Sequence, residues 1–371
     1  MEVKYCKRCV MPNTRHGLII DSEGICSSCR HTEYKKKVNW FSREKEFQKL
    51  CDKYRSKSDE NDCIIAVSGG KDSFWQTYTL KEKYKMNPLL VSVWSLDWTK
   101  TGLQNFETMQ SVFGCEAINL HSNLEVNRKL SRASLEHEGF PGWLYDRYIY
   151  TYPIWMSIKL NIPLVFYGEN TSLEFGGPVK SDIPSALCQF NNDVSHEYDK
   201  SFWEKAGVKQ RDVPFSKFPS SELLKNAKTN PQFMSYYFYW SGYQHMLLAK
   251  QHGWKSLNDT GEWNRTGWVD DFTQIDDVAY LIDGWIKYIK LATGPTTEFS
   301  SRLIRDGVMT REKAVKLVRE QDAVLDPLIL EHYLKFSGYS EREFFEVVDK
   351  LYNRNLFEKR GNKWKLKKEV S

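Results

Sequence analysis

A glycine-rich turn, Ser68-Gly69-Gly70-Lys71-Asp72-Ser73, holds the residues best suited to chemistry. A short β-branched apolar run, 63–67, precedes it, and a stretch with helical spacing of apolar residues, 72–84, follows it. A strand, a glycine turn and a helix start together direct free N–H groups and the positive end of the helix dipole at an anion. Lys71 adds a mobile positive charge. The spacing fits neither GxxxxGK[ST] nor GxGxxG, so we expect another type of phosphate site; a helix-start turn without a ligand is the alternative.

Four of the eight cysteines form two C-x2-C pairs, Cys6/Cys9 and Cys26/Cys29. This spacing is typical of zinc ribbons, in which two knuckle turns aim four thiolates at one tetrahedral ion. Four thiolates leave no position for water, so the Zn²⁺ would be structural. An iron–sulfur cluster could use the same ligands, and disulfides would suit a secreted protein. The N-terminus lacks the apolar stretch of a signal peptide, which argues against disulfides and favours the cytoplasm.

Strands and helices are expected to alternate along the middle of the chain. Apolar runs predict strands over 63–67, 89–94, 116–120 and 162–167, with helices over 40–58, 72–84 and 101–113. Such alternation predicts an α/β fold with a doubly wound parallel sheet, whose ligands lie beyond the carboxyl ends of the strands. Gly168-Glu169-Asn170 follows the fourth strand and so falls at that edge. Glu169 and Asn170 suit a polar group or a metal ion; a helix N-cap turn is the alternative.

Four regions follow from this pattern. We expect a zinc ribbon over 1–35, a helical linker over 36–60, the nucleotide-binding domain over 61–305 and a C-terminal helical region over 306–371. Residues 178–240 are expected to be an irregular insertion rich in aromatic residues and proline. Aromatic rings can stack on sugars, although core packing is the commoner role. Thr310 and Ser340 are expected to be helix N-caps, and a small hairpin is expected around Gly361.

Composition narrows the class of protein. Of the 371 residues, 41% are hydrophobic and 14% aromatic, which excludes extensive disorder, and the longest apolar runs are too short to span a membrane. Residues 353–371 carry seven Lys or Arg against two Glu, which equals the whole net charge of +5. The rest of the chain is balanced, so nucleic acid is not an expected partner. The basic tail could contact RNA or an acidic partner, or be a solvated end.

The turn Ser68–Ser73 resembles the SGGxDS signature of the PP-loop ATP pyrophosphatases. That resemblance implies cleavage of ATP to AMP and pyrophosphate while a substrate oxygen is adenylated, with Asp72 holding Mg²⁺. The ATP-binding residues that it implies are Ala66, Val67, Ser68, Gly69, Gly70, Lys71, Asp72, Ser73, Val93 and Gly168.

A longer stretch, about residues 4–322, resembles the N-acetyl sugar amidotransferase family of surface-polysaccharide and pseudaminic-type sugar pathways. The matching motifs are residues 6–15 around the first cysteine pair, 68–73, 167–170, Glu174-Phe175-Gly176-Gly177 and 304–312. Two positions depart from the family pattern: Pro295 follows Gly294 where the family has Arg soon after this Gly, and His16 replaces Pro.

The resemblance implies conversion of an N-acetyl group, such as one on a lipopolysaccharide O-antigen sugar, to an acetamidino group through an adenylated imidate. Lys71, Asp72 and Glu169 would be catalytic. The implied substrate-binding residues are Glu169, Asn170, Glu174, Gly176 and Gly177.

Ammonia must come from elsewhere, because the chain shows no glutaminase motif. Cys115 has no second glycine to form a nucleophile elbow, and residue 2 is Glu. The resemblance implies a separate glutaminase similar to that of imidazole glycerol phosphate synthase. Two alternatives stay open: a PP-loop enzyme that thiolates tRNA, although no cysteine pair follows the loop, and a non-catalytic zinc-ribbon scaffold.

Overall fold

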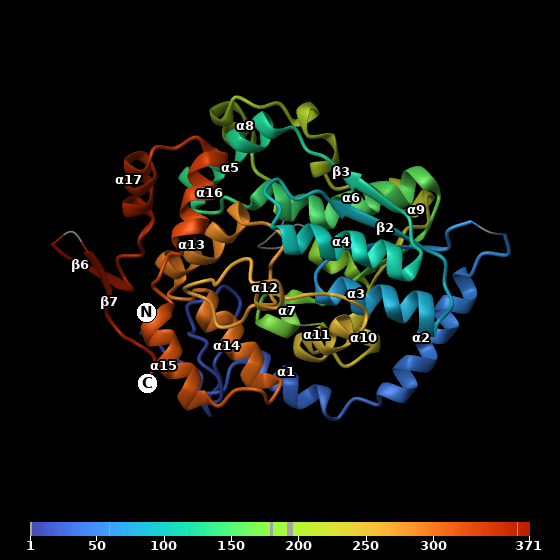
Figure 1. Ribbon diagram of the computed structural model, residues 1–371, viewed down its shortest axis with the longest axis horizontal. Coiled ribbons are helices and arrows are strands. Elements are labelled where there is room, and N and C mark those ends of the chain that lie inside the picture. The colour runs from blue at the N-terminus through green and yellow to red at the C-terminus, as the bar shows by residue number, and fades with distance from the viewer. Residues whose placement is uncertain (1, 59, 179–180, 191–195, 362) are drawn as a thin grey trace.

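The computed structural model of the protein describes residues 2–58, 60–178, 181–190, 196–361 and 363–371. At its centre lies a parallel sheet with the order β3-β2-β1-β4-β5 (Figure 1). The strands are β1 (Cys63–Ala66), β2 (Pro88–Val93), β3 (Ala117–Leu120), β4 (Leu164–Tyr167) and β5 (Asn230–Phe233). The predicted α/β class and the four expected strands are therefore confirmed.

Helices cover both faces of the sheet. On one face Ile65 of β1 packs with Phe47 and Phe74, and on the other its neighbour Ile64 packs with Leu130 and Trp143. Alternate residues of a buried parallel strand point to opposite faces, so both must be apolar. The first face carries α2 (Trp40–Tyr54), α3 (Lys71–Tyr78) with the π-helical turn Thr79–Lys83, α4 (Lys100–Phe113) and α11 (Gly242–Gln251); the second carries α5 (Leu124–Glu138), α6 (Trp143–Leu160) and α8 (Lys200–Ala206).

The segment 178–240, expected to be an irregular insertion, contributes the strand β5 to the sheet. β5 lies at its edge beside β4, where Pro231 is tolerated because an edge strand needs no second ladder partner. Phe202, Phe233 and Trp240 are buried, so these aromatic rings pack the core. The segment also holds α9 (Ser221–Asn226), α10 (Met234–Tyr237) and 3₁₀ turns at Ala186–Gln189, Gln210–Asp212 and Pro214–Ser216. Residues 179–180 and 191–195 of this segment lie outside the described residues.

The four N-terminal cysteines form a small cluster of their own, followed by α1 (Ser27–Lys35). Ile20 and Cys26 pair as an antiparallel bridge, and Gly24 takes a φ of +82° in the turn between them. These residues form a short hairpin between the two cysteine pairs. The cluster packs against Ile304 of α14 (Pro295–Arg305), so the ribbon is seated on the C-terminal half of the chain.

The C-terminal region is mostly helical, and its elements pack into more than one cluster: Ala314 with Val10 and Val370, and Ile329 with Phe344. Thr310 caps α15 (Arg311–Gln321) and Ser340 forms a capping box on α17 (Glu341–Leu351), as expected from their sequences. The hairpin around Gly361 is also present, and the two chain ends lie near each other (Figure 1). The remaining elements of the structure are α7 (Thr171–Phe175), α12 (Leu257–Thr260), the 3₁₀ turn Ala279–Leu281, α13 (Ile282–Leu291), α16 (Pro327–Ser337), β6 (Phe357–Arg360) and β7 (Lys363–Leu366).

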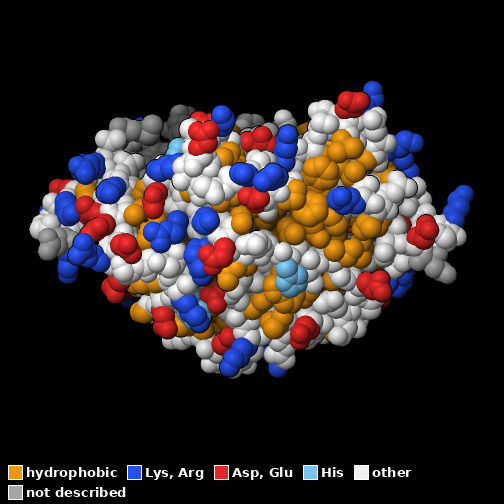
Figure 2. Space-filling model, turned by 90° about the horizontal axis from the view of Figure 1, so that it is seen from above, with side chains coloured by type: hydrophobic (Ala, Val, Ile, Leu, Met, Phe, Trp, Pro, Cys, Tyr) orange, Lys and Arg blue, Asp and Glu red, His pale blue; other side chains and the backbone are white. Residues whose placement is uncertain are grey.

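The surface in Figure 2, seen from above, mixes acidic and basic side chains and carries a patch of apolar side chains. This face therefore shows no continuous basic surface of the kind that binds a nucleic-acid backbone. Among the described residues, no helix is long and apolar enough to cross a membrane.

Candidate active site

The glycine-rich turn lies at the switch point of the sheet, between β1 and β4. Gly69 takes a φ of +87°, and a Cβ there would lie 2.9 Å from Cβ of Phe106, so both the backbone conformation and the close approach require glycine. The backbone N–H of Ser68 donates to Oγ of Ser73, at 3.0 Å, which closes the turn onto the start of α3. The helix N-terminus thus opens at the carboxyl edge of the sheet, where an anion is best stabilised.

Lys71 and Asp72 begin α3 as an ion pair, with Nζ and Oδ2 2.8 Å apart. The other carboxylate oxygen of Asp72 lies 2.7 Å from Nδ1 of His245, which α11 supplies. Burial would raise the pKa of Asp72, but the charge of Lys71 and the hydrogen bond from His245 outweigh it and hold that pKa below its ordinary value. Asp72 is therefore a carboxylate at neutral pH.

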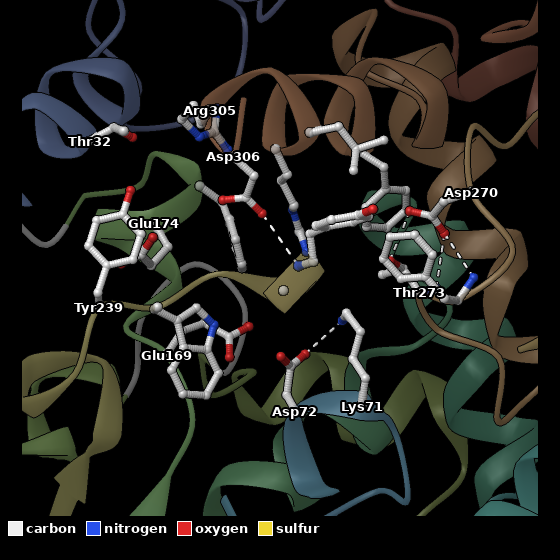
Figure 3. A pocket seen from close by; sticks show the side chains of 18 of the residues that line it. Thr32, Lys71, Asp72, Glu169, Glu174, Tyr239, Asp270, Thr273, Arg305 and Asp306 are labelled. Carbon is white, nitrogen blue, oxygen red and sulfur yellow. Dashed lines mark hydrogen bonds and ion pairs between the residues drawn. The ribbon is translucent and has the colours of Figure 1, made fainter. Parts of the chain in front are cut away.

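Glu169 follows β4 and faces Asp72 across the edge of the sheet (Figure 3). Burial, and then the negative charge of Asp72, raise its pKa to about 7. Two neighbouring carboxyl groups with separated pKa values can divide two roles, one as a fixed charge and the other as a proton acceptor or donor.

A cavity of about 280 Å³ opens on one side of the turn. The sheet residues in its wall are apolar, and Tyr145, Tyr150 and Tyr280 also line it. Apolar and aromatic walls of this kind suit a purine ring. Of the residues that the PP-loop resemblance implied for ATP, those lining this cavity are Ala66, Val67, Ser68, Asp72, Ser73, Val93 and Gly168. Gly70 and Lys71 line the neighbouring chamber, whereas the carbonyl of Gly69 accepts a hydrogen bond from Trp254.

A second chamber of about 310 Å³ adjoins the first. Ser68, Asp72, Ser73 and Glu169 lie in the walls of both, so a molecule in either chamber meets the same four residues. Gly176 and Gly177, implied for the substrate, line this chamber. Its other ionisable wall residues, away from the turn and Glu169, are Arg15, Asp146, Asp276, Lys287, Glu298 and Arg302.

Two residues implied for the substrate also hold local structure. The side-chain oxygen of Asn170 accepts hydrogen bonds from the N–H groups of Ser172 and Leu173, so it caps α7. Glu174 is buried and pairs with Lys35 of α1 at 2.8 Å. Lys35 lowers the pKa of Glu174 to about 2 against the opposing effect of burial. Glu174 thereby connects α7 to the ribbon.

Several groups at this site were not among the site residues expected from the sequence. His245 has no motif around it. Arg15 belongs to the family motif 6–15, but it reaches the chamber because the ribbon docks beside α7, where its Nε donates to the carbonyl of Gly176. Asp276 lines both chambers; burial, then the charge of Asp277, raise its pKa to about 7. Arg302 of α14 pairs with Glu298 and lies over the ring of Phe175, 3.4 Å from its centroid.

The four sulfur atoms of Cys6, Cys9, Cys26 and Cys29 all lie within 4.8 Å of one another and are buried. The Cys6–Cys29 and Cys9–Cys26 sulfur distances are 4.0 and 3.7 Å. Zn–S bonds of about 2.3 Å in a tetrahedron place sulfur atoms about 3.8 Å apart, so the cluster fits a structural Zn²⁺.

Residues 266–371 match the family model described as the C-terminal domain of WbpG-like LPS biosynthesis proteins. This match supports the sugar amidotransferase family that the motifs indicated.

Two further similarities involve Methanocaldococcus jannaschii. Over 102 residues, or 27% of its length, this chain is 35% identical to the uncharacterized protein MJ1599. The matched part spans about a third, 36%, of the length of that relative. A crystal structure described as a predicted subunit of tRNA methyltransferase is 13% identical in sequence to this chain and superposes with a TM-score of 0.28. The match covers 64% of this chain and 91% of the chain in that crystal structure.

Proposed function

We propose that this protein is an ATP-dependent amidotransferase that converts the N-acetyl group of a surface-polysaccharide sugar into an acetamidino group. The observation that carries the proposal is the pair of adjoining chambers, which share Ser68, Asp72, Ser73 and Glu169. One chamber has the walls of a nucleotide site and the other has room for a polar substrate. The match to LPS biosynthesis proteins supports a sugar pathway.

The reaction needs adenylation because an amide carbonyl is a poor electrophile and its oxygen a poor leaving group. The amide oxygen attacks the α-phosphorus of ATP, a P–O bond breaks and pyrophosphate leaves, while the amide nitrogen loses its proton to give an adenylated imidate. Ammonia then adds to the imidate carbon, the C–O bond breaks, AMP leaves and the amidine remains.

The chain's own groups suit these two steps. The turn N–H groups and Lys71 stabilise negative charge on the phosphates as it develops. Glu169, with its pKa of about 7, can accept a proton at neutral pH. Asp72 offers carboxylate oxygens at the phosphate end and so fits Mg²⁺, which is commonly bound by one or two carboxylates together with substrate phosphates. Bound there, Mg²⁺ would neutralise phosphate charge.

We propose that ammonia comes from a separate glutaminase. Cys115, the cysteine weighed as a nucleophile, borders a groove with Leu89 and Ile162 at the amino edge of the sheet, opposite the glycine-rich turn. Burial raises the pKa of its thiol, which disfavours the reactive thiolate.

Mass spectrometry on a panel of N-acetylated nucleotide sugars and nonulosonic-acid precursors, with ATP, Mg²⁺ and ammonium, tests the proposal. One sugar should gain NH in place of oxygen, with stoichiometric AMP and pyrophosphate. Lys71→Met should slow product formation by about 100-fold or more, because a charge at the phosphates is lost. Lys53→Met, at an exposed position of α2, is the matched control and should keep full activity. AMP release that needs tRNA rather than a sugar would contradict the proposal.

A further inference from the structure

A third cavity meets the two chambers at the same carboxyl groups. It is narrow, about 50 Å³, and Asp72 and Glu169 lie in its wall as they do in both chambers. Its other walls come from α1, the end of α7, residues 239–243, residues 270–273 and α14, and its α1 side faces the ribbon (Figure 3). The proposed reaction has three reactants, and three cavities converge on one point.

Size limits what this cavity can hold. At about 50 Å³ it is much smaller than either chamber, at about 280 and 310 Å³, so it suits a molecule of the size of water better than a sugar or a pyrophosphate. Ammonia is about as large as water. Its outer end includes Tyr239, whose side chain is 39% exposed, so the cavity reaches the surface of the chain.

Side chains with donors and with acceptors line the cavity. Arg302 and Arg305 lie in its wall and carry N–H donors. The carboxyl groups of Glu169 and Asp306 present acceptors. Ammonia has one lone pair and three N–H groups, so it can use both kinds of partner.

We propose that this cavity, from Thr32 and Tyr239 at the ribbon side to Glu169 at the reaction centre, is the passage by which ammonia reaches the adenylated substrate. The inference rests on the proposed amidotransferase function and adds the route of the nucleophile. A cavity that meets both chambers at Asp72 and Glu169 but also opens from the α1 side lets ammonia arrive after ATP and the sugar have filled the chambers. It also keeps the nucleophile away from bulk water, where ammonia is mostly protonated.

Thr32→Phe tests the passage, because a phenyl ring at Thr32 would fill its outer part. We expect the KM for ammonium chloride to rise at least tenfold. The adenylation half-reaction, followed as sugar-dependent exchange of labelled pyrophosphate into ATP, should continue. Lys36→Phe, an exposed position just after α1 that does not line the cavity, is the matched control and should keep the wild-type KM for ammonium.

The experiments can contradict the proposed function and the ammonia passage independently. No exchange in the wild-type protein with any sugar of the panel overturns the proposed function. Exchange with an unchanged ammonium KM in Thr32→Phe overturns the passage alone.

Leu303→Ala, which shortens a buried side chain in the cavity wall, provides the second variant if Phe at position 32 also abolishes exchange. Widening the passage should let methylammonium serve as nucleophile and yield an N-methylated amidine. Continued exclusion of methylammonium, with exchange intact, overturns the passage.

Discussion

Nδ1 of His245 lies 2.7 Å from Oδ1 of Asp72, on the opposite side of the carboxylate from Lys71. The imidazole stacks on Trp75, with ring centroids 4.4 Å apart, and is 2% exposed. Burial lowers the pKa of His245, so the ring is neutral near pH 7, and because its partner is a carboxylate, Nδ1 carries the hydrogen. His245 therefore fixes the direction of Asp72 without adding a charge.

Replacing His245 tests this positioning role. His245→Ala leaves one carboxylate oxygen of Asp72 without its donor, so we expect kcat for amidine formation to fall about 10- to 100-fold, as for other residues that orient a ligand group. His245→Asn keeps a side-chain N–H close to the place of Nδ1 and should recover part of this loss. The two variants are compared by steady-state kinetics, with Mg²⁺ varied. Equal kcat values for the two variants would contradict the orienting hydrogen bond.

Removing the ribbon's metal should affect the substrate chamber as well as the ribbon. Arg15 lines the chamber, and Gly176 faces Leu18 and Ser28 so closely that a Cβ there would lie 2.4 Å from Cδ1 of Leu18. We expect Cys26→Ser to lose the bound zinc, to lower Tm by about 5 °C or more and to raise the KM for the sugar.

Zinc content by elemental analysis and Tm by calorimetry check the ribbon prediction. Cys115→Ser, a buried cysteine at the far edge of the sheet, is the control and should retain one zinc per chain. A zinc-free Cys26→Ser protein with a wild-type Tm and sugar KM would show that the ribbon does not support the chamber.

Asp146 should make stability fall as pH rises. Burial, then the charge of Asp283, raise its pKa from 3.8 to about 7, and Oδ1 accepts a hydrogen bond from Tyr280. Between these two values the folded state keeps a proton that the unfolded state has lost, so the free energy of unfolding decreases with rising pH until the folded-state pKa is passed.

Asp146→Asn keeps the acceptor but never ionises. Its free energy of unfolding should exceed that of the wild type by a margin that grows by about 2–3 kcal/mol between pH 5 and pH 8, since one pKa unit corresponds to about 1.4 kcal/mol. Urea unfolding at several pH values measures the difference. Parallel curves for the two proteins would mean that Asp146 titrates normally.

The parts of the site with local signals were predictable. Residues 63–73 carry a strand, a turn and a helix start in one continuous segment, and the cysteine pairs carry their own spacing, so neither needs information from distant residues. β5 was missed because Asn230-Pro231-Gln232-Phe233 has no strand pattern and pairs with β4 as an edge. Its place in the sheet depends on the preceding fold.

His245, Arg15 and Arg302 were missed for another reason: each reaches the site through the packing of an element distant in the sequence. Asn170 shows that a residue at the expected place in the fold can have a structural role that its sequence position does not reveal. Its position after a strand end suited a ligand, but the same position begins α7, and capping uses its side-chain oxygen. Sequence position alone cannot distinguish these two uses, because both depend on a polar side chain at the carboxyl edge of a strand.

The mouth of the proposed ammonia passage should be where the glutaminase docks. Tyr239 at this mouth packs against Trp40, with ring centroids 5.9 Å apart, and the adjacent Phe41 is 67% exposed. An exposed aromatic side chain beside a passage suits burial under a partner, because aromatic residues contribute strongly to protein interfaces.

Phe41→Glu should therefore weaken docking while leaving the site intact. We expect glutamine-driven amidine formation to need at least about tenfold more glutaminase for half-maximal rate, since burying a charge in an apolar contact costs more than 1 kcal/mol. Ammonium-driven formation should be unchanged, because ammonium enters from solution. Phe345→Glu, at another exposed phenylalanine, on α17 and 38% exposed, is the control and should titrate like the wild type. If both variants require the same glutaminase concentration as the wild type, the partner docks elsewhere and ammonia must reach Glu169 by a different path.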